Sequence, residues 1–115
     1  MTLRKYEWKD LETLRKYFGM TQEDLANELD IARTTLSAVS KNIVRKERKR
    51  HYETIVGMFW EIFAIYYVKS YRVTKDSNPH YCYDLLLDYA NDMKDLRKID
   101  RLNFSEWYAR KEFEE

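Results

Sequence analysis

Side chains that could bind a polar, negatively charged ligand gather over residues 33–51. A helix is predicted over residues 33–40, with Leu36 and Val39 facing inward. Its hydrogen-bonding side chains then lie outside: Arg33, Thr34, Ser37 and Ser40. Residues 41–51 hold six Lys or Arg and one Glu. Guanidinium and hydroxyl groups donate hydrogen bonds and clustered cations attract polyanions, so the stretch indicates a nucleic-acid surface. An ordinary packing unit with a solvated basic face is the alternative interpretation.

Residue types that support other chemistry are sparse. His51 and His80 lie far apart and lack a metal-ligand spacing, so we predict surface or capping histidines. Cys82 is the single cysteine, and its position on an apolar helix side predicts a small core residue in a reducing cytoplasm. We find no glycine-rich phosphate loop, no nucleophile elbow and no metal-binding motif. The sequence therefore predicts a protein that is not an enzyme and needs neither cofactor nor metal.

The composition indicates an all-α fold. The chain has 115 residues, of which 44% are hydrophobic, with only 2 Gly and 1 Pro. Folds made of strands need many tight turns and usually more of both residues. The N-terminal residues lack the apolar core of a signal peptide, and we expect a cytoplasmic protein with no membrane contact.

Three short helices are predicted in the N-terminal third. Apolar residues recur at helical spacing over residues 6–18, and Gly19 ends that helix. Thr21 caps the second helix, and Asp30 to Ala32 form a short break before the third helix. Two helices that cross closely need a small residue, which Ala26 supplies. The side chains predicted to close the core between these helices are Leu29, Ile31, Leu36 and Val39.

A long apolar helix is predicted next, followed by one or two C-terminal helices. Residues 52–73 place apolar side chains on nearly all faces of a helix, so burial on several sides is expected, although Glu61 lies among them. Residues 74–78 form the predicted linker, with Asn78 as cap and Pro79 at the first helical position. That helix is predicted to reach about Lys98. It places on one side Cys82, Leu85, Leu86, Tyr89, Met93 and Leu96. It places on another side Asp84, Asp88 and Asp95. A last helix is expected to start with Ser105 as its cap.

Charge divides the chain unevenly. Residues 1–75 carry 15 Lys and Arg against 10 Asp and Glu, a net charge of +5, and residues 76–115 carry 6 against 10, a net charge of −4. A basic binding part and an acidic solvated or partner-facing part would give this pattern. We predict a helix-turn-helix domain over residues 1–50 and a helical extension for dimerisation or partner binding over residues 51–115.

The stretch TQEDLANELDIARTTLSAV, residues 21–39, resembles the phage Cro and repressor class of helix-turn-helix proteins, the XRE family. The preceding LRKYFGM is similar to the end of that family's first helix. The resemblance covers about residues 8–42. It implies a scaffold helix led by Gln22, a turn, and a recognition helix held outward to enter the major groove of double-stranded DNA.

Carried over position by position, the resemblance implies a set of DNA contacts. Arg33 would contact guanine with two hydrogen bonds, and Ala38 would touch a thymine methyl group. The implied base-contacting residues are Arg33, Thr34, Ser37 and Ala38. The implied phosphate-contacting residues are Gln22, Thr35, Lys41, Arg45, Lys46, Arg48, Lys49 and Arg50. The chain departs from the family pattern with Asp30 in place of a turn glycine, with Ala32 in place of a capping serine, and in everything after residue 42.

Two functions follow as expectations. The first is a transcriptional regulator, a repressor by occupancy, that binds a palindromic operator as a homodimer. Its expected dimer interface consists of Ile55, Phe59, Ile62, Phe63 and Tyr66. The alternative is a small phage-type inhibitor of a host nuclease, similar in plan to some anti-CRISPR proteins. It would contact its protein target through residues 76–115 and use the helix-turn-helix for autoregulation.

Overall fold

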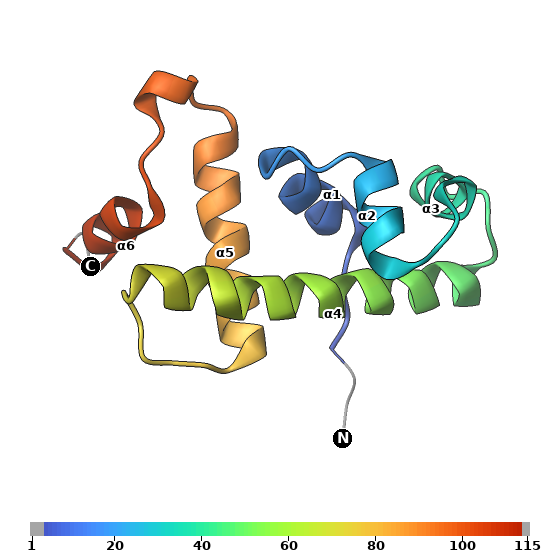
Figure 1. Ribbon diagram of the computed structural model, residues 1–115, viewed down its shortest axis with the longest axis horizontal. Coiled ribbons are helices and arrows are strands. Elements are labelled where there is room, and N and C mark those ends of the chain that lie inside the picture. Colours follow the sequence, from blue (N-terminus) through green and yellow to red (C-terminus); the bar gives the residue numbers. More distant parts are fainter. Residues whose placement is uncertain (1–3, 114–115) are drawn as a thin grey trace. The chain divides into compact units, whose positions relative to one another are not determined.

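The computed structural model describes residues 4–113, and this part of the chain holds helices and no strand (Figure 1). The helices are α1 (Trp8–Tyr17), α2 (Gln22–Leu29), α3 (Arg33–Ser40), α4 (Lys46–Tyr71), α5 (Pro79–Lys94), the 3-10 helix η1 (Lys98–Asp100) and α6 (Phe104–Phe113). The predicted all-α fold is confirmed. The chain forms two compact units, residues 1–60 and residues 61–115, and α4 passes from one unit into the other. The predicted DNA-binding domain lies within the first unit.

The first unit packs α1, α2 and α3 along the first half of α4 (Figure 1). Its buried side chains come from all four helices and include Leu11, Leu14, Leu25, Leu36 and Trp60. Ala26 is 1% exposed, in agreement with the predicted close packing of α2. The prediction that Leu29 and Ile31 close this core is only partly right, because both side chains are half-buried.

Three successive helices of this unit end in the same way. In each, a residue with positive φ follows the helix: Gly19 at 69°, Asp30 at 54° and Asn42 at 60°. The next amide then bonds back across the last turn, as in the 2.9 Å bond from Ile31 N to Ala26 O. This is the Schellman arrangement, which satisfies carbonyls that would otherwise lack partners. Sharp, fully hydrogen-bonded ends fix where α2 and α3 point.

Helix α4 is buried along a narrower stripe than the sequence predicted. The helix begins at Lys46, so the basic run leads directly into it, and it ends at Tyr71. Its fully buried residues follow a spacing of four: Val56, Trp60, Ala64 and Val68. Met58, Ile62 and Tyr66 are instead 54%, 56% and 72% exposed, which corrects the expectation of burial on several sides. Apolar residues on nearly all faces do not by themselves bury a helix, because burial requires neighbouring elements on each side.

The second unit is built around an aromatic cluster. Phe104 is completely buried, and its ring lies 5.8 Å from Tyr67, 5.4 Å from Tyr89 and 5.6 Å from Trp107, measured between centroids. The Tyr89 hydroxyl donates to Leu102 O at 2.6 Å. Burial and the hydrogen bond to Tyr71 raise the pKa of Tyr67. The rings of α4, α5 and α6 therefore form one core.

Two sequence predictions for this unit are wrong. Helix α5 ends at Lys94 rather than near Lys98, so Leu96 leaves the apolar stripe and is 39% exposed. The cap of α6 is Asn103 rather than Ser105, since its side chain accepts a 2.9 Å bond from Glu106 N. Asn is as good a cap as Ser, so the choice depends on where the preceding loop delivers the chain. The predicted cap of α5 is confirmed, with Asn78 Oδ1 accepting from His80 N at 2.9 Å.

Candidate nucleic-acid interface

The N-terminus of α2 is held by a reciprocal cap. Thr21 Oγ1 accepts from Asp24 N at 3.0 Å, and Asp24 Oδ2 accepts from Thr21 N at 2.9 Å. These hydrogen bonds, the backbone one first, lower the pKa of the Asp24 carboxyl. A lowered pKa means that this stabilisation is present above the carboxyl's ordinary pKa and is lost as the pH falls through the lowered value. The start of α2 is thus fixed at neutral pH.

The turn between α2 and α3 depends on Asp30. Its backbone adopts φ 54° and ψ 46°, the left-handed conformation that usually favours glycine. We expect Asp30→Gly to leave the melting temperature unchanged or higher. Asp30→Val should destabilise the protein by about 1–2 kcal/mol, because a β-branched residue is strained there. Thermal melts followed by circular dichroism measure both, and equal stability of the two variants would contradict this account of the turn.

Helix α3 presents the predicted outer face. Leu36 and Val39 are 1% and 0% exposed and face the core, whereas Arg33 and Thr34 are exposed. Ser37, Ala38 and Thr35 are half-buried. Ala32, which precedes the helix, provides no side-chain cap, so the first amides of α3 keep no such partner. Along the described chain Arg33 makes no ion pair.

Gln22 has a partner inside the protein. Its Nε2 donates to Ser40 Oγ at 3.1 Å, and the Ser40 hydroxyl donates to Ser37 O at 3.0 Å. This chain of bonds ties the start of α2 to the end of α3. Glu23 and Asp24 follow Gln22 in the first turn and would repel a phosphate. The geometry therefore favours Gln22 as a residue that positions α3 over one that contacts phosphate.

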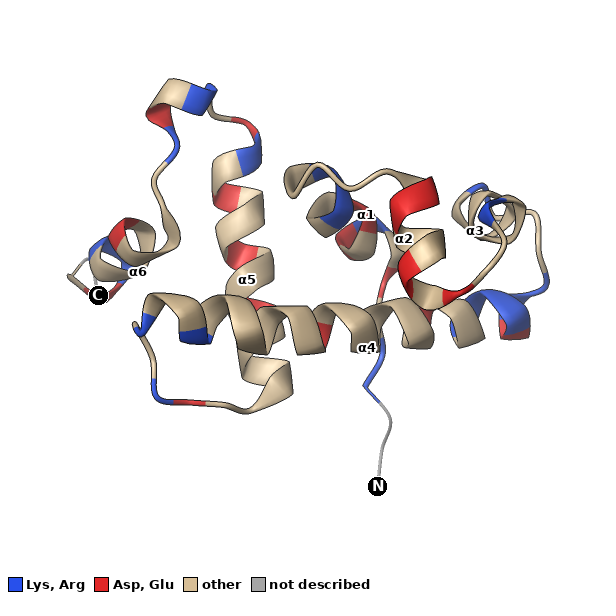
Figure 2. Ribbon diagram, in the orientation of Figure 1, with Lys and Arg blue, Asp and Glu red and all other residues tan. Residues whose placement is uncertain are grey.

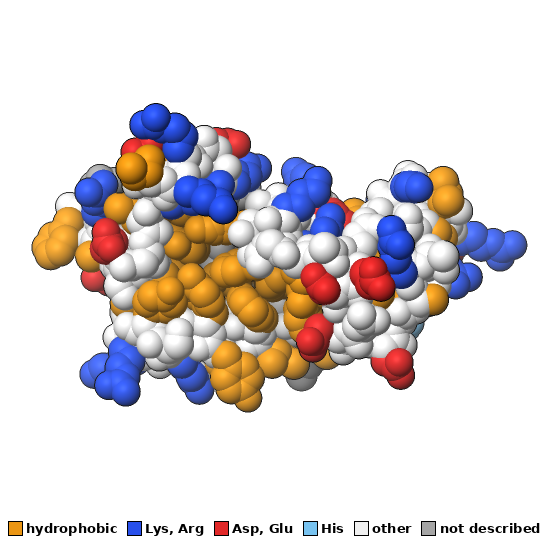
Figure 3. Space-filling view, turned by 45° about the horizontal axis from the view of Figure 1, so that its top comes forward, with side chains coloured by type: hydrophobic (Ala, Val, Ile, Leu, Met, Phe, Trp, Pro, Cys, Tyr) orange, Lys and Arg blue, Asp and Glu red, His pale blue; other side chains and the backbone are white. Residues whose placement is uncertain are grey.

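Cations surround the end of α3 and the start of α4 (Figures 2 and 3). All six Lys and Arg side chains of residues 41–51 are exposed except Lys49, which is half-buried. None of the six pairs with a carboxylate in the described residues. Arg48 lies over the Tyr52 ring, 5.9 Å from its centroid. Uncompensated cations at one end of a compact unit create a positive potential that would attract a polyanion.

The residues expected to form a dimer interface all lie on α4. Ile62 and Tyr66 are exposed, while Ile55, Phe59 and Phe63 are half-buried. Phe63 stacks on Tyr67, with 5.9 Å between ring centroids. An exposed isoleucine and an exposed tyrosine one helical turn apart provide apolar area that a second copy could cover.

The remaining candidates behave as structural groups. His80 Nδ1 lies 2.5 Å from Oε1 of Glu61, the buried carboxylate of α4. Burial raises the pKa of the Cys82 thiol, which makes it a poor nucleophile. Between residues 4 and 113 no three His, Cys, Asp or Glu side chains come together as metal ligands. Over the same span, no helix combines the length and apolar character needed to cross a bilayer.

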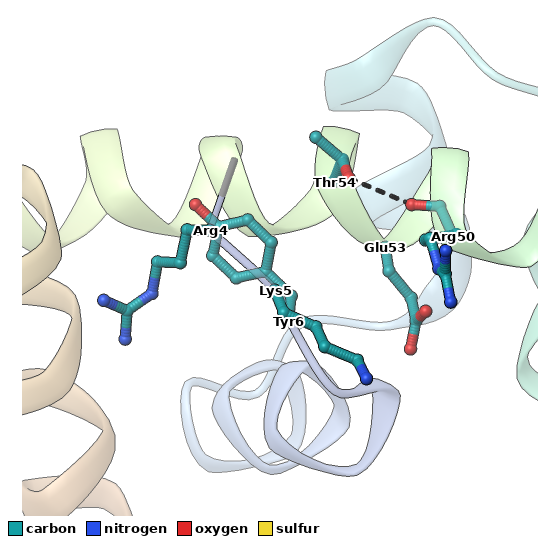
Figure 4. Close-up of a pocket in the computed structure, with 6 residues that line it drawn as sticks. All are labelled: Arg4, Lys5, Tyr6, Arg50, Glu53 and Thr54. Atoms are coloured by element: carbon teal, nitrogen blue, oxygen red, sulfur yellow. Dashed lines mark hydrogen bonds between the residues drawn. The ribbon is translucent and has the colours of Figure 1, made fainter. Parts of the chain in front are cut away.

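Arg4 and Lys5 were not among the predicted site residues, and the fold brings them to the first half of α4 (Figure 4). The one signal was Gly57, a glycine inside a helix, because such a residue often marks the close approach of another segment.

No family model, no curated protein and no solved structure matches the chain.

Proposed function

We propose that the protein is a sequence-specific regulator of transcription that binds double-stranded DNA through α3. The observation that carries the proposal is the outer face of α3. Arg33 and Thr34 are exposed there, without a part in the core, on a helix whose opposite side is fully buried. A helix that packs on one side and presents donors on the other can enter the major groove and contact base edges.

The neighbouring cations supply the affinity in this proposal. Lys41 follows α3, Arg45 precedes α4, and Arg48 lies in the first turn of α4. All three are exposed and without carboxylate partners in the described residues. Contacts from such side chains to phosphate release counterions and depend strongly on salt. The same potential guides the protein to DNA before any base is contacted. Repression by occupancy of an operator in the cytoplasm is the mechanism we propose for a chain of this size.

The deciding experiment is a selection from random duplex DNA with the purified protein at two salt concentrations. We expect an enriched motif that persists at the higher salt, and a palindrome whose half-sites are about one helical turn apart if two copies bind. Binding without any enriched sequence, lost uniformly with salt, would overturn the proposal of sequence-specific recognition.

Arg33→Ala tests the proposed recognition helix. We expect this change to weaken binding to the selected site by about 1–3 kcal/mol and to relax preference at one base pair. Lys41→Ala is the matched control, because loss of a phosphate contact should weaken selected and random DNA alike. Fluorescence anisotropy with both duplexes measures the two effects. An Arg33→Ala variant that kept its sequence preference would show that α3 does not contact bases as proposed.

The homodimer is also a proposal, and it rests on the exposed apolar side chains of α4 in the second unit. Tyr66 is 72% exposed and Ile62 is 56% exposed. We expect the double variant Ile62→Glu/Tyr66→Glu to be monomeric at concentrations where the parent is dimeric, because two buried like charges per copy oppose association. Light scattering after size-exclusion chromatography measures the mass. Lys69→Glu/Lys75→Glu, which changes exposed residues outside the interface, should remain dimeric.

A second candidate is an inhibitor that binds another protein through the acidic second unit. Asp84 and Asp88 are exposed on α5, beside a hollow of about 340 Å³ that Tyr81 and Tyr108 also line. The hydrogen bond that the Tyr108 hydroxyl donates to Tyr81, together with partial burial, raises the pKa of Tyr108 to about 12, so it stays neutral. Acidic and aromatic groups together suit a basic protein surface. This candidate becomes the stronger one if the DNA selection yields no motif.

A further inference from the structure

The first unit contains a cationic pocket that no residue of α3 lines. Its volume is about 420 Å³, and its lining comes from the N-terminal segment and α4: Arg4, Lys5, Tyr6, Arg50, Glu53 and Thr54 (Figure 4). A second hollow, of about 430 Å³, shares four of these residues and adds Lys46 and Lys49 from the first turn of α4. The two hollows therefore form one groove between residues 4–9 and the start of α4.

Two contacts fix the N-terminal segment against α4. Tyr6 is 6% exposed and its ring lies directly over Gly57, where a Cβ atom would come under 3.0 Å from the ring. Trp8 N donates to Glu53 Oε2 at 3.0 Å. Lys5 directly precedes the first of these anchors, so its ammonium group is delivered to the pocket by a segment that Tyr6 and Trp8 hold against α4. These two contacts within the protein hold the groove open.

The charges of the groove are not balanced within it. Glu7 pairs with Lys9 at 3.3 Å, and Glu53 accepts the Trp8 amide. Lys5 and Arg50 extend toward the Glu53 carboxylate in Figure 4, but neither forms an ion pair in the described part of the chain. Lys46 and Lys49 are likewise unpaired there. Lys46, Lys49 and Arg50 also lie near the N-terminal end of α4, a helix of 26 residues. The N-terminal end of a helix dipole is positive and repels these cations.

A buried polar atom at the same groove also lacks a partner. Trp8 lines the second hollow, and its indole Nε1 is buried without a hydrogen bond among the described residues. Buried donors are usually satisfied, by protein, water or ligand. A group with acceptor oxygens placed in the groove would offset the repulsion between the cations and accept hydrogen bonds from Lys5 and Arg50, which line it.

We infer that this groove binds a small molecule that carries phosphate groups, as a second ligand besides the proposed DNA. Phosphate oxygens match the ammonium and guanidinium donors of Lys5 and Arg50. A volume of a few hundred Å³ is typical of small-molecule sites. The inference goes beyond the proposed function, because it assigns Lys46, Lys49 and Arg50 to a groove of their own and does not require that α3 bind DNA.

Titration of the ¹⁵N-labelled full chain with pyrophosphate, followed by amide chemical shifts, tests the inference. We expect saturable shifts confined to residues 5–9 and 46–54. Lys5→Gln/Arg50→Gln should weaken binding about tenfold or more, since two charge-assisted contacts are lost. The matched control is Lys75→Gln/Lys94→Gln, which removes the same charge from two exposed positions of the second unit and should bind as the parent does.

Three results would overturn the inference. One is the absence of saturable shifts, and another is equal weakening in the two double variants, which would reduce the effect to net charge. The third is a Lys5→Gln/Arg50→Gln variant that still folds, as judged by its melt, and loses duplex DNA binding together with pyrophosphate binding. That result would make the groove a contact for the DNA backbone. Loss of pyrophosphate binding with DNA binding intact would support a separate small-molecule site.

Discussion

Phe104→Ala is expected to destabilise the protein by about 3–5 kcal/mol, the cost of removing a large aromatic side chain from a closed core. Phe104 is 0% exposed, and five rings surround it within about 6 Å between centroids: Tyr67, Tyr71, Tyr89, Trp107 and Tyr108. Truncation would leave a cavity that these rings cannot fill, because the backbones of α4, α5 and α6 hold them in place. Phe104 therefore joins α6 to the rings that α4 and α5 contribute to this core.

Urea denaturation followed by far-ultraviolet circular dichroism measures the effect. Phe113→Ala is the matched control, because Phe113 is in the same helix but 90% exposed, and we expect a change under about 0.5 kcal/mol. Phe104→Leu should lie between the two variants, since it keeps most of the apolar volume. Similar losses for Phe104→Ala and Phe113→Ala would mean that the aromatic cluster does not stabilise the second unit as described.

Gly57→Ala should destabilise the protein by about 2–3 kcal/mol, although alanine is the better helix former by about 1 kcal/mol. Gly57 lies inside α4, where its lack of a side chain is normally a cost. The ring of Tyr6 occupies the space that a Cβ atom would need, and Tyr6 is itself buried. The added methyl group must therefore push the N-terminal segment away from α4.

A double-mutant cycle with Tyr6→Ala isolates this contact. Once the ring is removed, Gly57→Ala should no longer destabilise and should regain the helix-forming advantage of alanine. The interaction free energy of the cycle should then be of opposite sign to the cost of either single change. A Gly57→Ala variant as stable as the parent would contradict the close packing of Tyr6 on α4, and with it the anchor of the cationic groove.

The local sequence determined where most helices begin and end. Thr21, Asp30 and Asn78 each stabilise a helix end through their own side chain or backbone conformation, so the limits of α2, the start of α3 and the start of α5 could be predicted from a few neighbouring residues. The spacing of Leu36 and Val39 likewise predicted which side of α3 is buried. These features depend on contacts within about one or two helical turns.

Only the tertiary structure decided which apolar and charged side chains meet. The stripe of α4 that is buried and the exposure of Leu96 both depend on where another segment lies. The cationic groove shows the same limit, because its Trp8–Glu53 bond joins residues 45 positions apart. Helical periodicity specifies the direction of a side chain on its own helix, but it holds no information on which distant segment will face that side chain.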